Sequence, residues 1–339
     1  MMPSESVPSE SVPAGPVSQL REAAVPDALA GERIDRIVAV IADVARSDAA
    51  ALVDDGRVRV NGVVLTQRSR RLVAGDEVSV AFVAAPERAP LAPDASVELR
   101  VIYEDDALVV VDKPAGLVVH PGAGNEGGTL VQGMLARYPE IAAMAAGAVG
   151  DDAYRPGIVH RIDKGTSGLL VVARTATAAA SLSAQLAART VERSYEALAV
   201  GHFDAVTGLV DAPIGRSAGD PSKMAVSASG REARTRYTVR RAYSRPDPLS
   251  FVICRLETGR THQIRVHLAA IGHPVFGDSR YGGGRGAFAA ALGRPFLHAA
   301  TLGFVHPVTG AAMRFDSPLP PDLAALLADL DAREADRLA

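Results

Sequence analysis

The residues best suited to chemistry lie in a short polar turn between two apolar runs. In the stretch RPGIVHRIDKGTSGLLVVAR, residues 155–174, Asp163 stands between Arg161 and Lys164 and is followed by GTSG. Loops carried on rigid strands often hold catalytic groups, and the flanking cations favour the ionised carboxylate that a nucleophile requires. A β-turn with surface ion pairs would use the same residues, so the pattern alone leaves both interpretations open.

Composition narrows the class of protein. The 339-residue chain is 48% apolar and 22% charged, which is typical of a globular protein with two domains. The apolar stretches are too short for a membrane span, and residues 1–17 lack the features of a secretory signal. The single cysteine, Cys254, excludes a disulfide within the chain and has the apolar neighbours of a buried strand residue. We therefore expect a cytoplasmic protein that does not associate with membranes.

The net charge of −3 is unevenly distributed. Residues 1–32 and residues 316–339 each carry −4, so that residues 33–315 carry +5. Acidic ends thus mask a basic body, and the total charge neither supports nor excludes a nucleic-acid partner.

The N-terminal part of the chain predicts a tail and a small domain. Residues 1–25 contain a Pro/Ser/Glu repeat with little apolar surface, which predicts disorder. Residues 26–84 contain apolar residues at helical spacing, a second helix over 49–53, and two alternating runs about Asn61-Gly62 that predict a hairpin. The arginines of this domain are candidate phosphate contacts, although a solvated basic surface would look the same: Arg33, Arg46, Arg57, Arg59, Arg68, Arg70 and Arg71.

A Pro-rich linker at residues 85–95 separates this unit from a larger α+β domain at 96–320, and residues 321–339 predict a terminal helix. Many strands and few helices predict a mixed, largely antiparallel sheet. Strands are expected at 97–103, 108–111, 117–120, 169–172, 195–200, 235–239 and 251–256, helices near 129–137, 176–189 and 261–271, and a loop insertion at 139–156. Thr258 or Thr261 is the expected cap of the last helix.

Five motifs in chain order resemble the pseudouridine synthases that modify ribosomal and transfer RNA, in the family that includes the large-subunit rRNA enzymes. HRIDKGTSG is similar to the signature HR(L/I)DKxTSG of that family. The other motifs are KPAGLVVHPGAGN at 113–125, RSYEALAV at 193–200, PIGR to KMAV at 213–226, and LETGRTHQIRVHL at 256–268. The form HPGAGN resembles the D-type members, and residues 26–84 resemble the S4 RNA-binding domain.

The resemblance implies a set of site residues. It implies that Asp163 is the catalytic nucleophile, that Arg260 forms a salt bridge with Asp163, and that Tyr195 stacks on the target base. From the residues alone a core position is the favoured explanation for Tyr195, although Ala197 and Ala199 on the same strand face leave room beside its ring. Further substrate or RNA contacts are expected from His160, Arg161, Lys164, Ile264, Arg216 and Lys223, the last two on a hairpin that a solvated loop would explain as well.

The implied reaction is the site-specific isomerisation of uridine to pseudouridine in 23S ribosomal RNA or a large-subunit precursor, at the D-type site. This reaction is redox-neutral and implies no cofactor. His262 and His267 are five residues apart, whereas a helical zinc pair prefers four, so no metal is expected. No obligate protein partner is evident. A catalytically silent RNA-binding or ribosome-assembly factor on the same scaffold and an aspartate-nucleophile hydrolase are the alternatives.

Overall fold

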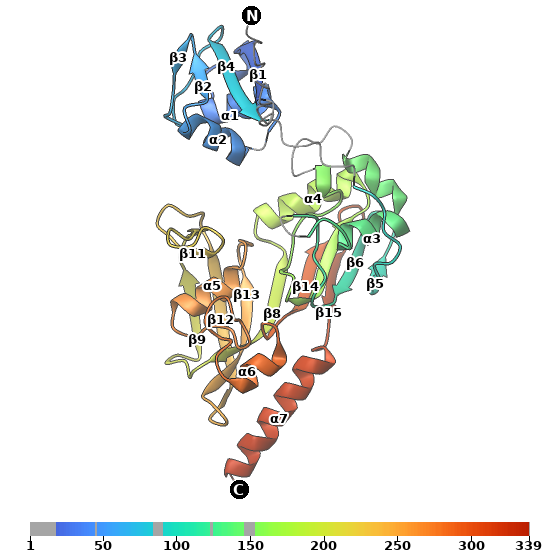
Figure 1. Ribbon diagram of the computed structural model, residues 1–339. Coiled ribbons are helices and arrows are strands. Elements are labelled where there is room, and N and C mark those ends of the chain that lie inside the picture. Colours follow the sequence, from blue (N-terminus) through green and yellow to red (C-terminus); the bar gives the residue numbers. More distant parts are fainter. Residues whose placement is uncertain (1–17, 45, 84–90, 123–124, 146–152, 339) are drawn as a thin grey trace, which may run out of the picture. The chain divides into compact units, whose positions relative to one another are not determined.

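The computed structural model describes residues 18–44, 46–83, 91–122, 125–145 and 153–338 (Figure 1). The chain divides into two compact units: Met1–Pro90 with Gly147–Tyr154, and Leu91–Ala146 with Arg155–Ala339. Each unit has its own hydrophobic core, and each is described by itself.

The N-terminal unit is a four-stranded antiparallel sheet with two helices. Ile34, Ile37, Val53 and Val80 are buried together in its core, as the helical and alternating spacings predict. The helices are α1 (Ile34–Ala42) and α2 (Arg46–Asp54), with a short 3-10 helix η1 (Asp27–Leu29) before them. The sheet has the order β1 (Ser18–Ala24), β4 (Glu77–Val83), β2 (Val58–Val60) and β3 (Val63–Val64).

The predicted hairpin is confirmed. Asn61 and Gly62 connect β2 to β3 with φ angles of 50° and 78°, the positive values that a tight hairpin turn requires. These two residue types tolerate such angles because glycine lacks a Cβ and asparagine is small.

The prediction of disorder up to residue 25 was wrong for residues 18–24. These residues form the edge strand β1, which pairs antiparallel with β4 from Ser18 opposite Val83 to Ala24 opposite Glu77. The stretch lacks a strong apolar signal because backbone hydrogen bonds hold an edge strand, and Leu20 on it stays exposed. The domain boundary expected at residue 26 is therefore too late. Residues 1–17 and the linker residues 85–90 lie outside the described residues.

The larger unit is a mixed, largely antiparallel sheet, as predicted. Among the described strands, β7 and β14 form its one parallel pair, and all other pairs are antiparallel. The order is β5 (Val101–Glu104), β6 (Leu108–Lys113), β7 (Ser167–Ala173), β14 (Leu297–Val305), β8 (Glu192–Val200), β13 (Leu249–Leu256), β12 (Arg234–Tyr243) and β9 (Thr207–Asp211), with β15 (Ala312–Asp316) on β14.

The helices of this unit agree with the predicted ranges except for Ala287–Leu292, where no helix was predicted. They are α3 (Leu130–Arg137), α4 (Ala176–Ala187), α5 (Gln263–Ala270), α6 (Ala287–Leu292) and the terminal α7 (Pro321–Leu338). A separate hairpin consists of β10 (Ile214–Arg216) and β11 (Met224–Val226). Strands β9, β14 and β15 were not predicted. Residues 117–120 form no strand, and Pro139–Ala145 is a 3-10 helix where a loop was expected. Residues 146–152 of that expected loop lie outside the described residues.

Helix α5 begins later than predicted. Its N-cap is His262, with φ at 57°, and no side chain caps it. The expected caps are wrong, because Thr258 donates its hydroxyl hydrogen bond to Oε1 of Gln263 at 2.7 Å. The later start changes which residues of this segment face the sheet.

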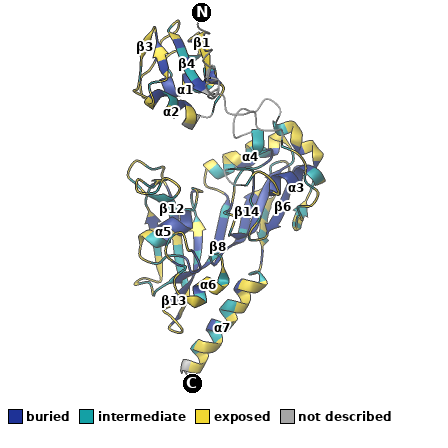
Figure 2. Cartoon of the chain, in the orientation of Figure 1, coloured by how far each residue is buried: buried dark blue, intermediate teal, exposed yellow. Residues whose placement is uncertain are grey.

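The centre of the large sheet is buried on both faces (Figure 2). Tyr195, Ala197 and Ala199 of β8 pack with Ile264 and Leu268 of α5 in one apolar cluster. Cys254 of β13 belongs to the same cluster and is fully buried, as predicted. This packing fixes the first turns of α5 against the middle of the sheet.

Gly168 is required where β7 meets β14. Its φ is +113°, and an added Cβ would lie 2.3 Å from the carbonyl oxygen of Ala299. We expect Gly168→Ala to lower the free energy of unfolding by about 1–3 kcal/mol from backbone strain alone, with a further loss from the overlap. Gly219→Ala is the matched control, because no other atom lies within 4 Å of the position that a Cβ would take there. Denaturant unfolding of both variants checks this, and equal stabilities would contradict it.

Candidate active site

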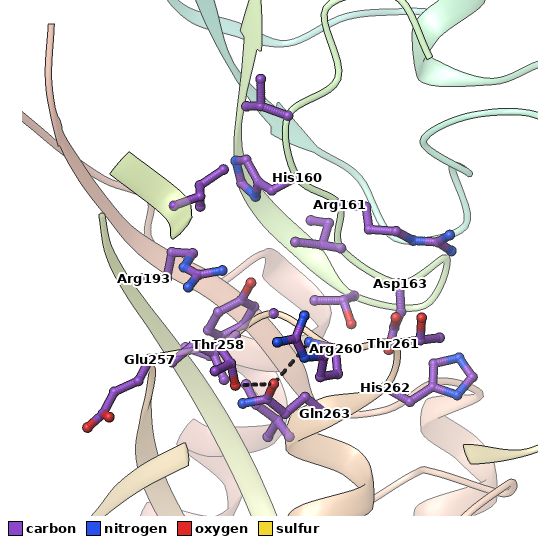
Figure 3. Close-up of a pocket in the computed structure, with 18 of the residues that line it drawn as sticks. His160, Arg161, Asp163, Arg193, Glu257, Thr258, Arg260, Thr261, His262 and Gln263 are labelled. Atoms are coloured by element: carbon purple, nitrogen blue, oxygen red, sulfur yellow. Dashed lines mark hydrogen bonds between the residues drawn. The ribbon is translucent and has the colours of Figure 1, made fainter. Parts of the chain in front are cut away.

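A cavity of about 790 Å³ lies in the larger unit (Figure 3). Its walls come from the turn that carries Asp163, from β8 with Tyr195, and from the segment that leads into α5. The volume is in the range of small-molecule sites and accommodates a nucleotide. Most of the motifs that the sequence pattern selected therefore meet at one place.

The turn that carries Asp163 is held by backbone hydrogen bonds. The amide of Thr166 donates to the carbonyl of Asp163 at 3.0 Å, which closes the turn. The amide of Gly116 donates to the carbonyl of Lys164 at 2.7 Å and connects this turn to the KPAG motif. The side chain of Asp163 is 16% exposed, so the carboxylate is accessible but largely enclosed.

Lys113 supports the same turn. Its ammonium donates to the carbonyls of Pro114 and Leu117 at 2.8 Å each, and more weakly to that of Lys164 at 3.4 Å. Burial lowers the pKa of Lys113 to about 7, against an opposing effect of the nearby Asp163 carboxylate. Lys113 was not among the site residues predicted from the sequence.

Asp163 is paired with Arg265 of α5. Nη1 of Arg265 lies 3.1 Å from Oδ2 of Asp163, while its Nε and Nη2 donate to the two carboxylate oxygens of Asp278 at 2.6 and 2.9 Å. The side chains of Arg265 and Asp278 are 9% and 1% exposed. Asp278 also accepts from the backbone amides of Arg280 and Tyr281. A bidentate pair of this kind fixes the guanidinium plane and points its remaining nitrogen at Asp163.

The expected salt bridge between Arg260 and Asp163 is wrong. Arg260 precedes α5, and its Nε donates to the carbonyl of Glu232 at 2.8 Å. Its backbone amide donates to Oε1 of Gln263 at 2.9 Å. Both arginines belong to one short motif, and the start of the helix at Gln263 decides that Arg265 faces Asp163. Arg260 still lines the cavity.

Tyr195 and Ile264 form an apolar wall. They are 6% and 3% exposed, and both line the cavity. Burial raises the pKa of Tyr195 to about 12; Arg193 opposes this shift and Asp163 adds to it. The phenol is therefore protonated at neutral pH, and Tyr195 presents a neutral ring.

His160 and Arg161 also line the cavity, whereas Lys164 does not. The ring of His160 accepts a hydrogen bond from the amide of Val171 at 3.2 Å, and burial, with a smaller effect of Arg193, lowers its pKa to about 3. The imidazole is therefore neutral. Arg161 is exposed, and Nζ of Lys164 donates to Oδ1 of Asn125 at 3.0 Å.

The remaining predicted basic residues are not among those that line this cavity. Arg216 of β10 donates to the carbonyl of Pro221 at 3.0 Å, and Lys223 lies 3.6 Å from Asp220. In the N-terminal unit Arg33 pairs with Asp35 at 3.1 Å, Arg57 and Arg59 are exposed, and Arg46 lies in α2. Their expected contacts with RNA stay predictions.

Arg193, Arg265 and Asp278 of the site were also missed from the sequence. An acid directly after the apolar Val275-Phe276 and Gly277 was the available signal for Asp278. Within the described ranges, no three His, Cys, Asp or Glu side chains are grouped as metal ligands, and no helix is long and apolar enough to span a membrane.

Comparisons with known proteins agree with this geometry. The family described as RNA pseudouridylate synthase matches residues 107–270. The chain is 43% identical to ribosomal large subunit pseudouridine synthase D of Xanthomonas campestris, over 95% of this chain and 96% of that protein. It is 41% identical to the RNA pseudouridine synthase YlyB of Bacillus subtilis, which is described as uncharacterized, over 88% and 94%. The structure of human RNA Pseudouridylate Synthase Domain Containing 1 has a TM-score of 0.53 and 29% identity, over 69% of this chain and 89% of that one.

We expect Asp278→Asn to destabilise the protein through Arg265. Removal of one partner from a buried ion pair costs about 3–5 kcal/mol in free energy of unfolding. Asp329→Asn is the matched control, because the Asp329–Arg333 pair is exposed and solvent screens its attraction. Urea unfolding measures both variants, and a loss for Asp278→Asn no larger than that of the control would contradict the assigned role.

Proposed function

Because the chain belongs to the RNA pseudouridylate synthase family, we propose that it converts particular uridines of large-subunit ribosomal RNA to pseudouridine. The observation that carries this proposal is the Asp163 carboxylate, which a buried arginine holds at the wall of a nucleotide-sized cavity. The relatives named as ribosomal large subunit pseudouridine synthase D support rRNA as the substrate and the D-type site as the target. The substrate also requires a cytoplasmic location.

The reaction breaks the N1–C1′ bond of a uridine, turns the free uracil within the site, and joins C5 to C1′. Asp163 supplies the carboxylate, which attacks the sugar or the uracil ring or promotes a glycal-type elimination. Arg265 keeps this carboxylate charged and oriented, the role first expected of Arg260. Atoms and electrons balance within the nucleotide itself, so the reaction requires no cofactor.

The apolar wall retains the uracil between the two bond changes. Tyr195 and Ile264 exclude water from one side of the cavity, where a detached base would otherwise escape. Because the Tyr195 phenol is protonated, we assign it to stacking on the base rather than to acting as a charged base.

Access to the uridine requires that it leave its stack. Flipping a nucleotide costs a few kcal/mol, which contacts to the displaced strand must offset. Arg161 is exposed at the cavity and 3.2 Å from the ring of His120, and we assign it to the vacated space or the neighbouring phosphate. Lys164, Arg216 and Lys223 remain candidate phosphate contacts.

The N-terminal unit adds affinity. Its S4-like order of helices and hairpin and its exposed Arg57 and Arg59 support an electrostatic contact with RNA. Arg33 and Arg46 are further candidates. Recognition is then shared between this unit, which binds RNA through charge, and the cavity, which selects local shape.

We expect Asp163→Asn to abolish catalysis while the fold is retained. The amide has the same shape but cannot act as a nucleophile or carry negative charge. Pseudouridine is mapped in 23S rRNA from cells that lack the protein and that are complemented with wild type or Asp163→Asn. The matched control is Asp211→Asn, an exposed acid of β9. Full modification with the Asp163 variant would exclude Asp163 as the catalytic group, and a map unchanged by the deletion would exclude the proposed substrate.

We expect deletion of residues 1–90 to weaken binding of rRNA and to leave slow activity on a short stem-loop. The larger unit keeps its own cores, so the cavity should persist. Affinity for a 23S rRNA transcript and turnover on the stem-loop are measured side by side. An affinity equal to that of the full chain would contradict the RNA-binding role of the N-terminal unit.

A further inference from the structure

A group of arginines lines the active-site cavity without contacting Asp163. Arg193, Arg231 and Arg260 all lie on its wall, and the acids on that wall are Asp163 and Glu257. Asp163 is committed to Arg265, and Glu257 to Arg234 and Arg236. The cavity therefore carries a surplus of positive charge. The mechanism proposed above assigns no role to these three arginines.

Arg193 is the least exposed of these arginines. It is 7% exposed, and its buried Nε has no hydrogen-bond partner among the described residues. Burial lowers its pKa, opposed only by Tyr195. Its Nη1 lies so close to Gly259 that a Cβ there would be 2.8 Å away, so the glycine makes space for the guanidinium. An unpaired buried charge is costly, and a missing anion is a physical reason for keeping it.

Arg260 and Arg231 extend the charge. Burial is the largest cause that lowers the pKa of Arg260, followed by repulsion from Arg231, while Glu232 opposes them. The carboxylate of Glu232 is already held by Arg189 at 2.6 Å. The positive charges of Arg260 and Arg231 thus lie close enough to repel each other, and the neighbouring carboxylate of Glu232 is already paired with Arg189.

This group lies near the reacting base. The pKa of Tyr195 responds to Arg193 and to Asp163, so the ring is within electrostatic reach of both. In Figure 3, Arg193 and Arg260 extend into the cavity from different segments of the chain.

We propose that Arg193, Arg231 and Arg260 form a subsite for a backbone phosphate of the RNA, next to the flipped uridine. The inference rests on the proposed function, because it takes RNA as the ligand. Guanidinium groups match the oxygens of a phosphodiester with paired hydrogen bonds, and the negative charge satisfies the buried Arg193. Arg260 thus binds the substrate directly, whereas Arg265 orients Asp163.

The test is the salt dependence of RNA binding. The probe is an unmodified in vitro transcript of 23S rRNA, titrated at several KCl concentrations with wild type, Arg193→Gln, Arg231→Gln and Arg260→Gln. Complete loss of this one phosphate contact should reduce the slope of log Kd against log salt by about 0.7–0.9, and each single substitution should reduce the slope by up to that amount. Arg255→Gln is the matched control, because Arg255 is exposed on β13 and does not line the cavity. We expect its slope to equal that of wild type.

Several outcomes would overturn the subsite. Unchanged slopes for Arg231→Gln and Arg260→Gln contradict it even if Arg193→Gln fails to fold. Weaker affinity at an unchanged slope would indicate a structural role and contradicts it too. Pseudouridine formation by the wild type on the same transcript separates the two proposals. Activity with unchanged slopes refutes only the subsite, whereas reduced slopes without any wild-type activity refute only the assigned reaction.

Discussion

The bridge that Arg265 makes between Asp278 and Asp163 is the interaction on which the site depends. Asp278 binds Arg265 through two hydrogen bonds and so fixes the orientation of its guanidinium group. The remaining nitrogen, Nη1, then orients the carboxylate of Asp163. Since Arg265 and Asp278 are almost completely buried, solvent does not weaken their attraction as it does at the surface. The fixed guanidinium group in turn orients the partly exposed side chain of Asp163.

Two distant parts of the sequence must meet for this bridge to form. Asp163 precedes β7, and Arg265 lies 102 residues further on, in α5. Packing of Ile264 and Leu268 against β8 orients α5. In this orientation the side chain of Arg265 points at the loop before β7. The packing of the apolar core therefore determines where the ion pair between Arg265 and Asp163 can form.

The sequence predicted the site well where residue type decides position. Asp163 was predicted from the charged turn around it, whereas Tyr195 and Ile264 were predicted from the resemblance of the motifs to a known family, and all three line the cavity. It failed between Arg260 and Arg265, because the choice depends on where α5 begins, and His262 in a left-handed conformation sets that start. Strand β1 was missed for a related reason, since it forms by pairing with β4 and its own residues do not indicate that pairing.

The net charge of −3 does not show that the protein gathers positive charge where an anionic partner would bind. The wall of the cavity gathers cations whose repulsion the fold tolerates. One of these cations, Arg265, is neutralised by Asp163 and Asp278, whereas a group of three, Arg193, Arg231 and Arg260, forms no salt bridge among the described residues. A site that only needed to orient a carboxylate would require Arg265 alone. The group of three costs stability in the free protein, and it becomes favourable only when an anion arrives with the substrate.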